Sequence, residues 1–239
     1  MYYNKYKGNI SSNKNLEIME LFADASLKNI DKRDFVCSGA ICINTSEERY
    51  TITADSTSNR GEILAVFLAI QMAHENLKKY PNRFKRINVY SDSQLSVLGT
   101  TKYMHTWIKN STNDQEILYK PDNKPVQNQD LLMMVVTYCV ANNLIINMYD
   151  QKAHVNLESK KSLIEANKYF YKANGFYLKK DEIYKISHYN GLIDKKSRDL
   201  LQYVNPNQYP RAKFNNKELL CHYIVPTNFW KYIHIGGRW

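Results

Sequence analysis

The chain has few cysteines, and none of them form a metal-binding pair. Cys37, Cys42, Cys139 and Cys221 include no Cys-x-x-Cys spacing, so neither a zinc knuckle nor a disulfide framework is indicated. Cys37 and Cys42 fall in one strand-like run and would point to opposite faces of a sheet. We interpret them as reduced core residues in a reducing compartment.

Long hydrophobic runs are also missing. The longest apolar stretches, residues 63–70 and 131–141, are much shorter than the roughly 20 residues that a membrane-spanning helix needs. Residues 1–10 contain no apolar signal region. We therefore expect a soluble, cytoplasmic protein that has no membrane partner.

Acidic residues are fewer than basic ones. The 239 residues include 33 lysines and arginines against 23 acids, which gives a formal charge of +10. This excess favours a polyanionic partner, because lysine and arginine neutralise phosphates and release their counterions. A generally basic, solvated surface is the alternative interpretation. The 19 tyrosines, many among lysines in the last third, suit stacking on bases but also ordinary packing.

The hydrophobic pattern predicts an α/β fold with a mixed sheet of five strands. Three strands separated by short turns indicate an antiparallel meander. The fourth strand follows a helical crossover and is therefore expected to run parallel to the first, as is the fifth. The strands are predicted at 17–25, 34–44, 48–55, 87–90 and 144–149, and helices at 60–79, 94–99, 102–109, 131–142 and 158–173.

Three segments follow from this pattern. Residues 1–16 are polar and are predicted to form a flexible leader. Residues 17–175 are predicted to form the main folded domain, and 176–239 a C-terminal extension of unknown role. The extension contains lysines and aromatic residues, so it either contacts nucleic acid or packs against a sheet edge or helix face.

Three carboxylates stand at the ends of predicted elements without adjacent lysines. Asp24 and Asp92 end strand-like runs, and Glu62 lies in the opening turn of the long helix. A cluster of acids repels itself unless a positive group lies between its members. Carboxylate oxygens favour Mg²⁺ or Mn²⁺, which points to metal-dependent phosphodiester chemistry. Taken singly, each acid is also compatible with a turn or with the helix dipole.

Five short motifs extend this pattern. They are Asp24-Ala25-Ser26, Thr57-Ser58-Asn59-Arg60-Gly61-Glu62, Tyr90-Ser91-Asp92-Ser93-Gln94, Lys102-Tyr103-Met104-His105-Thr106-Trp107 and Lys124-Pro125-Val126-Gln127-Asn128-Gln129-Asp130-Leu131. Together they resemble the type 1 ribonucleases H over about residues 19–170. The resemblance implies the ribonuclease H-like fold with flanking helices. It also implies an endoribonuclease that cuts the RNA strand of RNA–DNA hybrids and leaves 5′-phosphates.

The resemblance also implies roles for individual residues. Asp24, Glu62 and Asp92 would bind two Mg²⁺ ions, with Mn²⁺ as the alternative, in a two-metal mechanism. Asn59 and Gln94 match positions that hydrogen-bond the minor groove of the hybrid, and Ser93 and Trp107 are grouped with them as substrate-binding residues. His154 matches a loop histidine that assists proton movement and product release. We expect the protein to act as a monomer.

The chain departs from the family where a fourth carboxylate is expected. The family has an Asn-x-x-Ala-Asp segment after the loop histidine, whereas this chain has Ala166-Asn167. We therefore predict that Asn167 is the fourth metal ligand and catalytic position, with weaker binding of one ion because an amide carries no charge. Glu165 and Asp150 remain alternatives.

The region corresponding to the family's basic substrate loop also has less net positive charge than the family's loop. Between Trp107 and Pro125 the lysines are matched by acids, so part of the affinity for nucleic acid would have to come from elsewhere, such as residues 176–239. Two other functions remain open. One is a degenerate member that binds hybrid or duplex without cutting it, and the other is a different nuclease of the same superfold.

Overall fold

A computed structural model describes residues 16–111, 117–209 and 233–235. The predicted leader lies outside these ranges except for residue 16. The basic and aromatic positions of the predicted extension beyond residue 209 also lie outside them, apart from the short strand at 233–235.

The centre of the molecule is a mixed sheet with the strand order β3-β2-β1-β4-β5-β6. The strands β1, β2 and β3 pair antiparallel, and β4, β5 and β6 continue from β1 in parallel. The predicted five-stranded arrangement is confirmed, and a short sixth strand from the C-terminal segment is added at the β5 edge. The bounds are β1 Glu17–Ile30, β2 Arg33–Cys42, β3 Glu47–Ala54, β4 Phe84–Ser91, β5 Ile146–Asp150 and β6 Ile233–Ile235.

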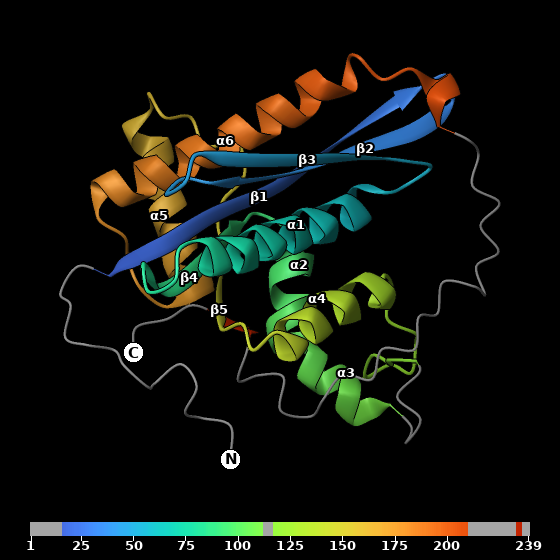
Figure 1. Cartoon of the computed structure of the whole chain (residues 1–239), viewed down its shortest axis with the longest axis horizontal. Helices are drawn as coiled ribbons and strands as arrows, with labels where there is room; N and C mark the ends of the chain where they lie inside the picture. Colours follow the sequence, from blue (N-terminus) through green and yellow to red (C-terminus); the bar gives the residue numbers. More distant parts are fainter. Residues whose placement is uncertain (1–15, 112–116, 210–232, 236–239) are drawn as a thin grey trace.

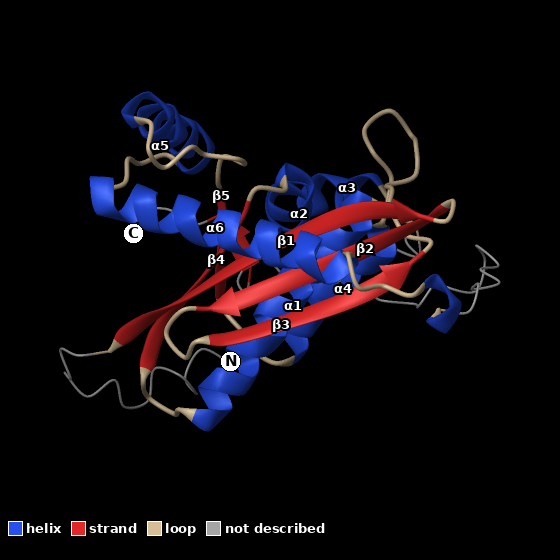
Figure 2. Ribbon diagram, turned by 90° about the horizontal axis from the view of Figure 1, so that it is seen from above, coloured by secondary structure: helices blue, strands red, loops and turns tan. Residues whose placement is uncertain are grey.

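Helices cover both faces of this sheet. Figure 1 shows α1 and α6 on opposite sides of the long strands, and Figure 2 shows the same separation from above. No described helix has both the length and the apolar character that crossing a membrane requires. The bounds are α1 Ser58–Lys79, α2 Gln94–Leu98, α3 Met104–Asn110, α4 Gln129–Ala141, α5 Lys160–Asn174 and α6 Lys180–Leu201, with a π-helical turn at Gly99–Tyr103 and a 3₁₀ turn at Pro206–Gln208.

Alternating residues of β1 build two cores. Leu21 and Ala23 are fully buried in the core shared with α1, while Phe22 points to the opposite face, as the period of two along a strand requires. There Phe22 stacks on Tyr90 of β4 at 5.0 Å and on Tyr189 of α6 at 5.2 Å between ring centroids. Packing against α1 on one face and against the aromatic core on the other therefore fixes β1 up to the position of Asp24.

The helix α6 belongs to the same packed unit as the sheet. Its Ile183, Ile186 and Ile193 are buried against the aromatic core on that face, and Leu201 closes a smaller core with β2. The domain boundary predicted at residue 175 falls inside this unit. Gly175 itself does end α5, with a φ of 85° that suits glycine.

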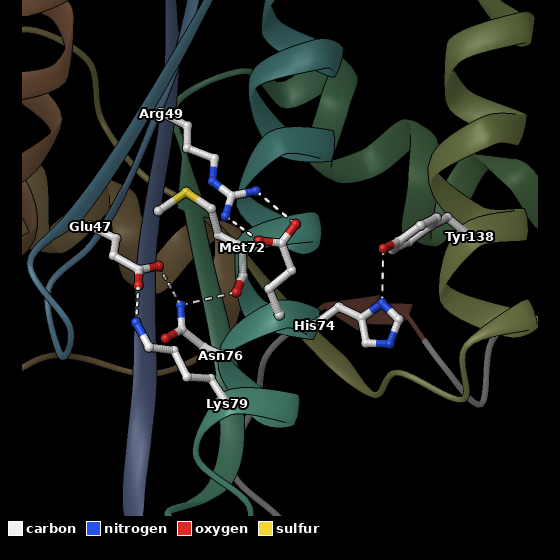
Figure 3. A network of polar contacts seen from close by, with 8 residues as sticks. Glu47, Arg49, Met72, His74, Asn76, Lys79 and Tyr138 are labelled. Carbon is white, nitrogen blue, oxygen red and sulfur yellow. Dashed lines mark hydrogen bonds and ion pairs between the residues drawn. The ribbon is translucent and has the colours of Figure 1, made fainter.

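The far half of α1 is fastened to β3 and α4 by polar contacts (Figure 3). Asn76 donates to Glu47 over 3.0 Å, and Arg49 forms a two-pronged ion pair with the neighbouring Glu75. His74 shares a 2.8 Å hydrogen bond with the hydroxyl of Tyr138. These contacts fix the axis of the helix whose other end carries Glu62.

Candidate metal centre and active site

The register of two parallel strands places Asp24 and Asp92 next to each other. The pairing of β1 with β4 is in register at Phe22 and Tyr90, where it ends. Asp24 and Asp92 each lie two residues further on, Asp24 still within β1 and Asp92 just past the end of β4, so the two residues are neighbours where this pairing ends. Beyond the last pair the two strands are no longer bonded to each other, which leaves room for side chains from the helices.

Glu62 reaches this point because the first turn of α1 lies unusually close to the sheet. Thr57 caps the helix and accepts a hydrogen bond from the amide of Arg60. A Cβ on Gly61 would come within 2.1 Å of a methyl group of Val36, so only glycine fits there. The hydroxyl of Ser38 donates to the carbonyl of Gly61 over 2.8 Å and holds the turn in place.

Asp24, Glu62 and Asp92 form a compact cluster of hard oxygen ligands. One carboxylate oxygen from each lies within 4.8 Å of the others. In the part of the chain that the structure describes, no lysine or arginine forms an ion pair with any of the three. Within the same residues, Oε2 of Glu62 is buried and has no hydrogen-bond partner. An orphaned buried oxygen in an all-carboxylate set fits a divalent cation such as Mg²⁺.

The electrostatics of the three groups agree with this fit. Burial raises the pKa of Asp24, and the charge of Asp92 raises it further. Burial likewise raises the pKa of Glu62, to which the charges of Asp24 and Asp92 add. Burial also raises the pKa of Asp92. Ionising all three without a counter-charge is therefore unfavourable, and a bound cation would reverse the direction of these shifts.

Asp92 is oriented by a buried amide from α6. Nδ2 of Asn190 donates to Oδ2 of Asp92 over 2.9 Å, and Oδ1 of Asn190 accepts from Gln151 over 2.7 Å. Asn190 is only 4% exposed, and its hydrogen bond to Asp92 is partly buried. One oxygen of Asp92 is thereby held by the protein.

A cavity of about 420 Å³ opens over the three carboxylates. Asn59, Ser93 and Gln94 line it, as do His154 and Asp194. Four of the residues predicted from the sequence to touch substrate or assist the reaction are therefore brought together around the acids. Ser93 also has a structural task there, since its hydroxyl caps α2 by accepting from the amide of Ser96.

His154 lies on the loop after β5, where the sequence places it. Its side chain is 80% exposed, and its Nδ1 lies 3.7 Å from Oδ2 of Asp194. The backbone adopts a left-handed φ of 50°, which turns the chain sharply at the mouth of the cavity. An exposed imidazole beside the cavity can take up or release a proton without rearrangement of the core.

The structure does not bring Asn167 to the cavity. Its amide is fully used elsewhere, because Nδ2 donates to the carbonyl of Leu178 over 2.8 Å and Oδ1 accepts from the amide of the same residue over 2.9 Å. Glu165 is exposed and pairs with Lys152 at 3.3 Å. Asp150 is buried at the end of β5 and accepts from Tyr169. Asn167 thus joins α5 to the following turn and is not a ligand of the cluster.

Asp194 of α6, which the sequence did not single out, lies at the cavity where Asn167 was expected. It lines the cavity, where it accepts from the hydroxyl of Ser26 over 3.1 Å and pairs with Arg198 at 3.0 Å. Its charge raises the pKa of both Asp24 and Asp92. The prediction missed Asp194 because α5 intervenes between the loop histidine and this helix. A usable signal was present, since Asn190 and Asp194 are polar residues one turn apart on the buried stripe of α6.

Trp107 does not face the cavity. It is 7% exposed and belongs to the core between the sheet and α4, so its ring is not available for stacking on a base. Tyr103, whose ring lies 5.8 Å from it between centroids, is 40% exposed. Its burial gives no support to the substrate-binding role predicted for Trp107.

Comparison with known proteins assigns the family. The RNase H family model matches residues 16–164, and the chain belongs to the ribonuclease H family. It is 39% identical over 88 residues to ribonuclease H of Rickettsia massiliae, covering 37% of this chain and 49% of that protein. Ribonuclease HI of Rickettsia conorii is 38% identical over the same length, with the same shares covered.

These relatives match only in part. The chain spans about half the length of the curated relatives it matches. Among solved structures, the prototype foamy virus protease–reverse transcriptase aligns with a TM-score of 0.46 and 15% identity over 78% of this chain and 21% of that one. That likeness is too distant to inform function.

Proposed function

We propose that this protein is an endoribonuclease that hydrolyses the RNA strand of RNA–DNA hybrids with the help of two Mg²⁺ ions, for which Mn²⁺ can substitute. The observation that carries the proposal is the cluster of Asp24, Glu62 and Asp92, with carboxylate oxygens within 4.8 Å of one another and one buried oxygen of Glu62 left without a partner among the described residues. Membership of the ribonuclease H family supports the same activity.

Four side chains would hold the ions. Asp24, Glu62 and Asp92 are the main ligands, and Asp194 takes the fourth position in place of Asn167. When bound, such a pair of ions activates a water and steadies the leaving oxygen of an in-line displacement at phosphorus. Asn190 contributes by holding Oδ2 of Asp92, so that the other oxygen stays directed toward the cluster.

The remaining cavity residues handle substrate and protons. Asn59 and Gln94 line the cavity and can exchange hydrogen bonds with ribose 2′-hydroxyls and base edges, which is how a protein tells RNA from DNA. Ser93 lies between Asp92 and Gln94, and by capping α2 it fixes the backbone that carries both residues. His154 would move a proton at its imidazole, next to Asp194.

The surroundings of the enzyme are also part of the proposal. We take the catalytic unit to extend through α6, because the helix that carries Asp194 packs on β1 and β2. We expect the protein to act as a monomer in the reducing cytoplasm. The binding-only alternative depended on an amide at the fourth position, and the position of Asp194 at the cavity supports the cleaving enzyme over it.

A hybrid-cleavage assay tests the proposal. The wild-type protein with Mg²⁺ or Mn²⁺ is expected to cut the RNA strand of a hybrid and to leave double-stranded DNA intact. Asp92→Asn should abolish cleavage while the melting temperature and the binding of hybrid are retained. Asp199→Asn is the matched control, because Asp199 is an exposed acid on α6. Turnover by Asp92→Asn, or no cleavage by the wild-type protein with either ion, would overturn the assignment.

A further inference from the structure

Tyr169 of the helix α5 contacts Gln94, which lines the cavity. The amide Nε2 of Gln94 donates to the hydroxyl oxygen of Tyr169 over 2.8 Å. The same hydroxyl lies 3.1 Å from both carboxylate oxygens of Asp150. Asp150, Tyr169 and Gln94 therefore form a chain of hydrogen bonds that leads from the end of β5 to the wall of the cavity.

The direction of these hydrogen bonds follows from the groups involved. Both carboxylate oxygens of Asp150 accept from the hydroxyl of Tyr169. The hydroxyl of Tyr169 has a single hydrogen, which it gives to Asp150. Its oxygen must then accept from Gln94, so the NH₂ group of Gln94 faces Tyr169. The carbonyl oxygen of Gln94 is left for the cavity.

The position of Tyr169 is itself rigid. Asn174 clamps α5 to the end of β5, since its Nδ2 donates to the carbonyl of Asp150 over 2.7 Å and its Oδ1 accepts from the amide of Asp150 over 3.1 Å. The neighbouring Phe170 is fully buried and stacks on Tyr149 of β5, with 5.9 Å between ring centroids. A side chain fixed on both sides in this way can restrict the rotamer of an exposed glutamine.

We propose that Tyr169 is a positioning residue that fixes the side-chain amide of Gln94 with its carbonyl oxygen directed into the cavity. Gln94 then presents a hydrogen-bond acceptor, which suits a donor in the minor groove of the hybrid: a ribose 2′-hydroxyl or the exocyclic amine of guanine. Tyr169 acts through Gln94 and does not touch the nucleic acid itself. The inference rests on the proposed function and adds a determinant of substrate binding.

The test is a double-mutant cycle with Tyr169→Phe and Gln94→Ala, read out as KM and kcat for hybrid cleavage. Loss of the hydroxyl is expected to raise KM roughly 2- to 10-fold, the effect of one hydrogen bond, with a much smaller change in kcat. In the Gln94→Ala background, Tyr169→Phe should have no further effect on KM. The matched control is Tyr171→Phe. Tyr171 lies on the same helix, its ring stacks on Tyr177, and its side chain is 46% exposed.

Other outcomes separate the two proposals. If the wild-type protein cleaves hybrid but Tyr169→Phe leaves KM unchanged, the positioning role is overturned and the nuclease assignment stands. The positioning role is also overturned if the effects of Tyr169→Phe and Gln94→Ala on KM are fully additive and Tyr169→Phe lowers the melting temperature. That pattern is expected of a tyrosine whose role is purely structural. Absence of cleavage by the wild-type protein overturns the proposed function and this inference with it.

Discussion

Asn190 of α6 and Asp92 at the end of β4 are joined by a 2.9 Å hydrogen bond in which the amide donates to the carboxylate. The two residues are 98 positions apart in the chain, yet they meet in a partly buried contact because α6 crosses the sheet at this point. Asn190 also accepts from Gln151, so its amide cannot rotate without breaking both contacts. One carboxylate of the cluster is therefore held by an element outside the three that supply the acids.

Replacing Asn190 should weaken metal binding more than it weakens the fold. In Asn190→Ala, Oδ2 of Asp92 loses its donor and the carboxylate can rotate away from the cluster. Loss of such an outer contact costs about 10- to 100-fold in metal affinity or activity. We expect the Mg²⁺ concentration for half-maximal cleavage to rise by that order, measured by Mg²⁺ titration of the hybrid-cleavage rate. Asp199→Ala on the exposed side of α6 should leave the titration unchanged, and an unshifted midpoint in Asn190→Ala would contradict the positioning of Asp92.

Adding one methyl group at Gly61 should displace Glu62. A Cβ at this position would come within 2.1 Å of Val36 and 3.1 Å of Ala25, so the first turn of α1 must move off the sheet. Gly61→Ala is expected to lose about 1–3 kcal/mol of unfolding free energy through overpacking, together with cleavage activity. Urea denaturation and the hybrid-cleavage assay measure the two effects.

Gly191→Ala is the matched control for this change. Gly191 lies in α6, and a Cβ there meets nothing within 4 Å. Its replacement should stabilise the protein by about 0.5–1 kcal/mol, because alanine loses less conformational freedom in a helix. Equal behaviour of the two variants would show that the approach of α1 to the sheet does not depend on glycine.

The sheet and the three acids could be predicted from the sequence because each depends on local patterns. Alternation in the strands, the helical crossover before β4 and the short motifs around Asp24, Glu62 and Asp92 are all contained within a few residues. The directions of the strands followed from connection rules, and the observed directions agree with them. The sixth strand was not predictable from pattern, since three residues with one histidine among them carry almost no periodic signal.

The prediction of the fourth carboxylate failed for a different physical reason. The segment around Asn167 resembled the family motif only in its Ala166-Asn167 pair, and α5 packs through Phe170 and uses Asn167 to bind the turn at Leu178. Asp194 became a cavity residue only through the packing of α6 across β1, which is a long-range contact. Similarly, Trp107 was predicted to bind substrate from its place in an aromatic segment, and an aromatic residue in a sequence can lie in the core or on the surface.

Asp194 and Asn167 should respond in opposite ways to exchange of acid and amide. Asp194→Asn removes a charge beside the cluster and should raise the Mg²⁺ requirement, with little loss of stability because Ser26 can still donate to the amide oxygen. Asn167→Asp places a carboxylate against the carbonyl of Leu178, where an NH₂ group donates at present. It should lower the melting temperature without lowering the Mg²⁺ requirement. Thermal melting and Mg²⁺ titration of both variants check this, and a gain of activity in Asn167→Asp would restore the interpretation favoured by sequence.

The stability of the metal-free protein should fall as the pH rises. The pKa of Glu62 is raised from its ordinary value of 4.5, first by burial and then by Asp24 and Asp92. The folded state therefore binds more protons than the unfolded state above that value, and the unfolding free energy decreases with pH until Glu62 is ionised in both states. In a chelating buffer the melting temperature of the wild-type protein should drop from mildly acidic to alkaline pH, and that of Glu62→Gln should drop less. Addition of Mg²⁺ should raise the melting temperature of the wild-type protein at alkaline pH, because the ion binds the ionised cluster. Mg²⁺ should raise the melting temperature of Glu62→Gln much less. Identical pH profiles of the melting temperature for the two proteins, with and without Mg²⁺, would mean that the three carboxylates neither repel one another nor share an ion.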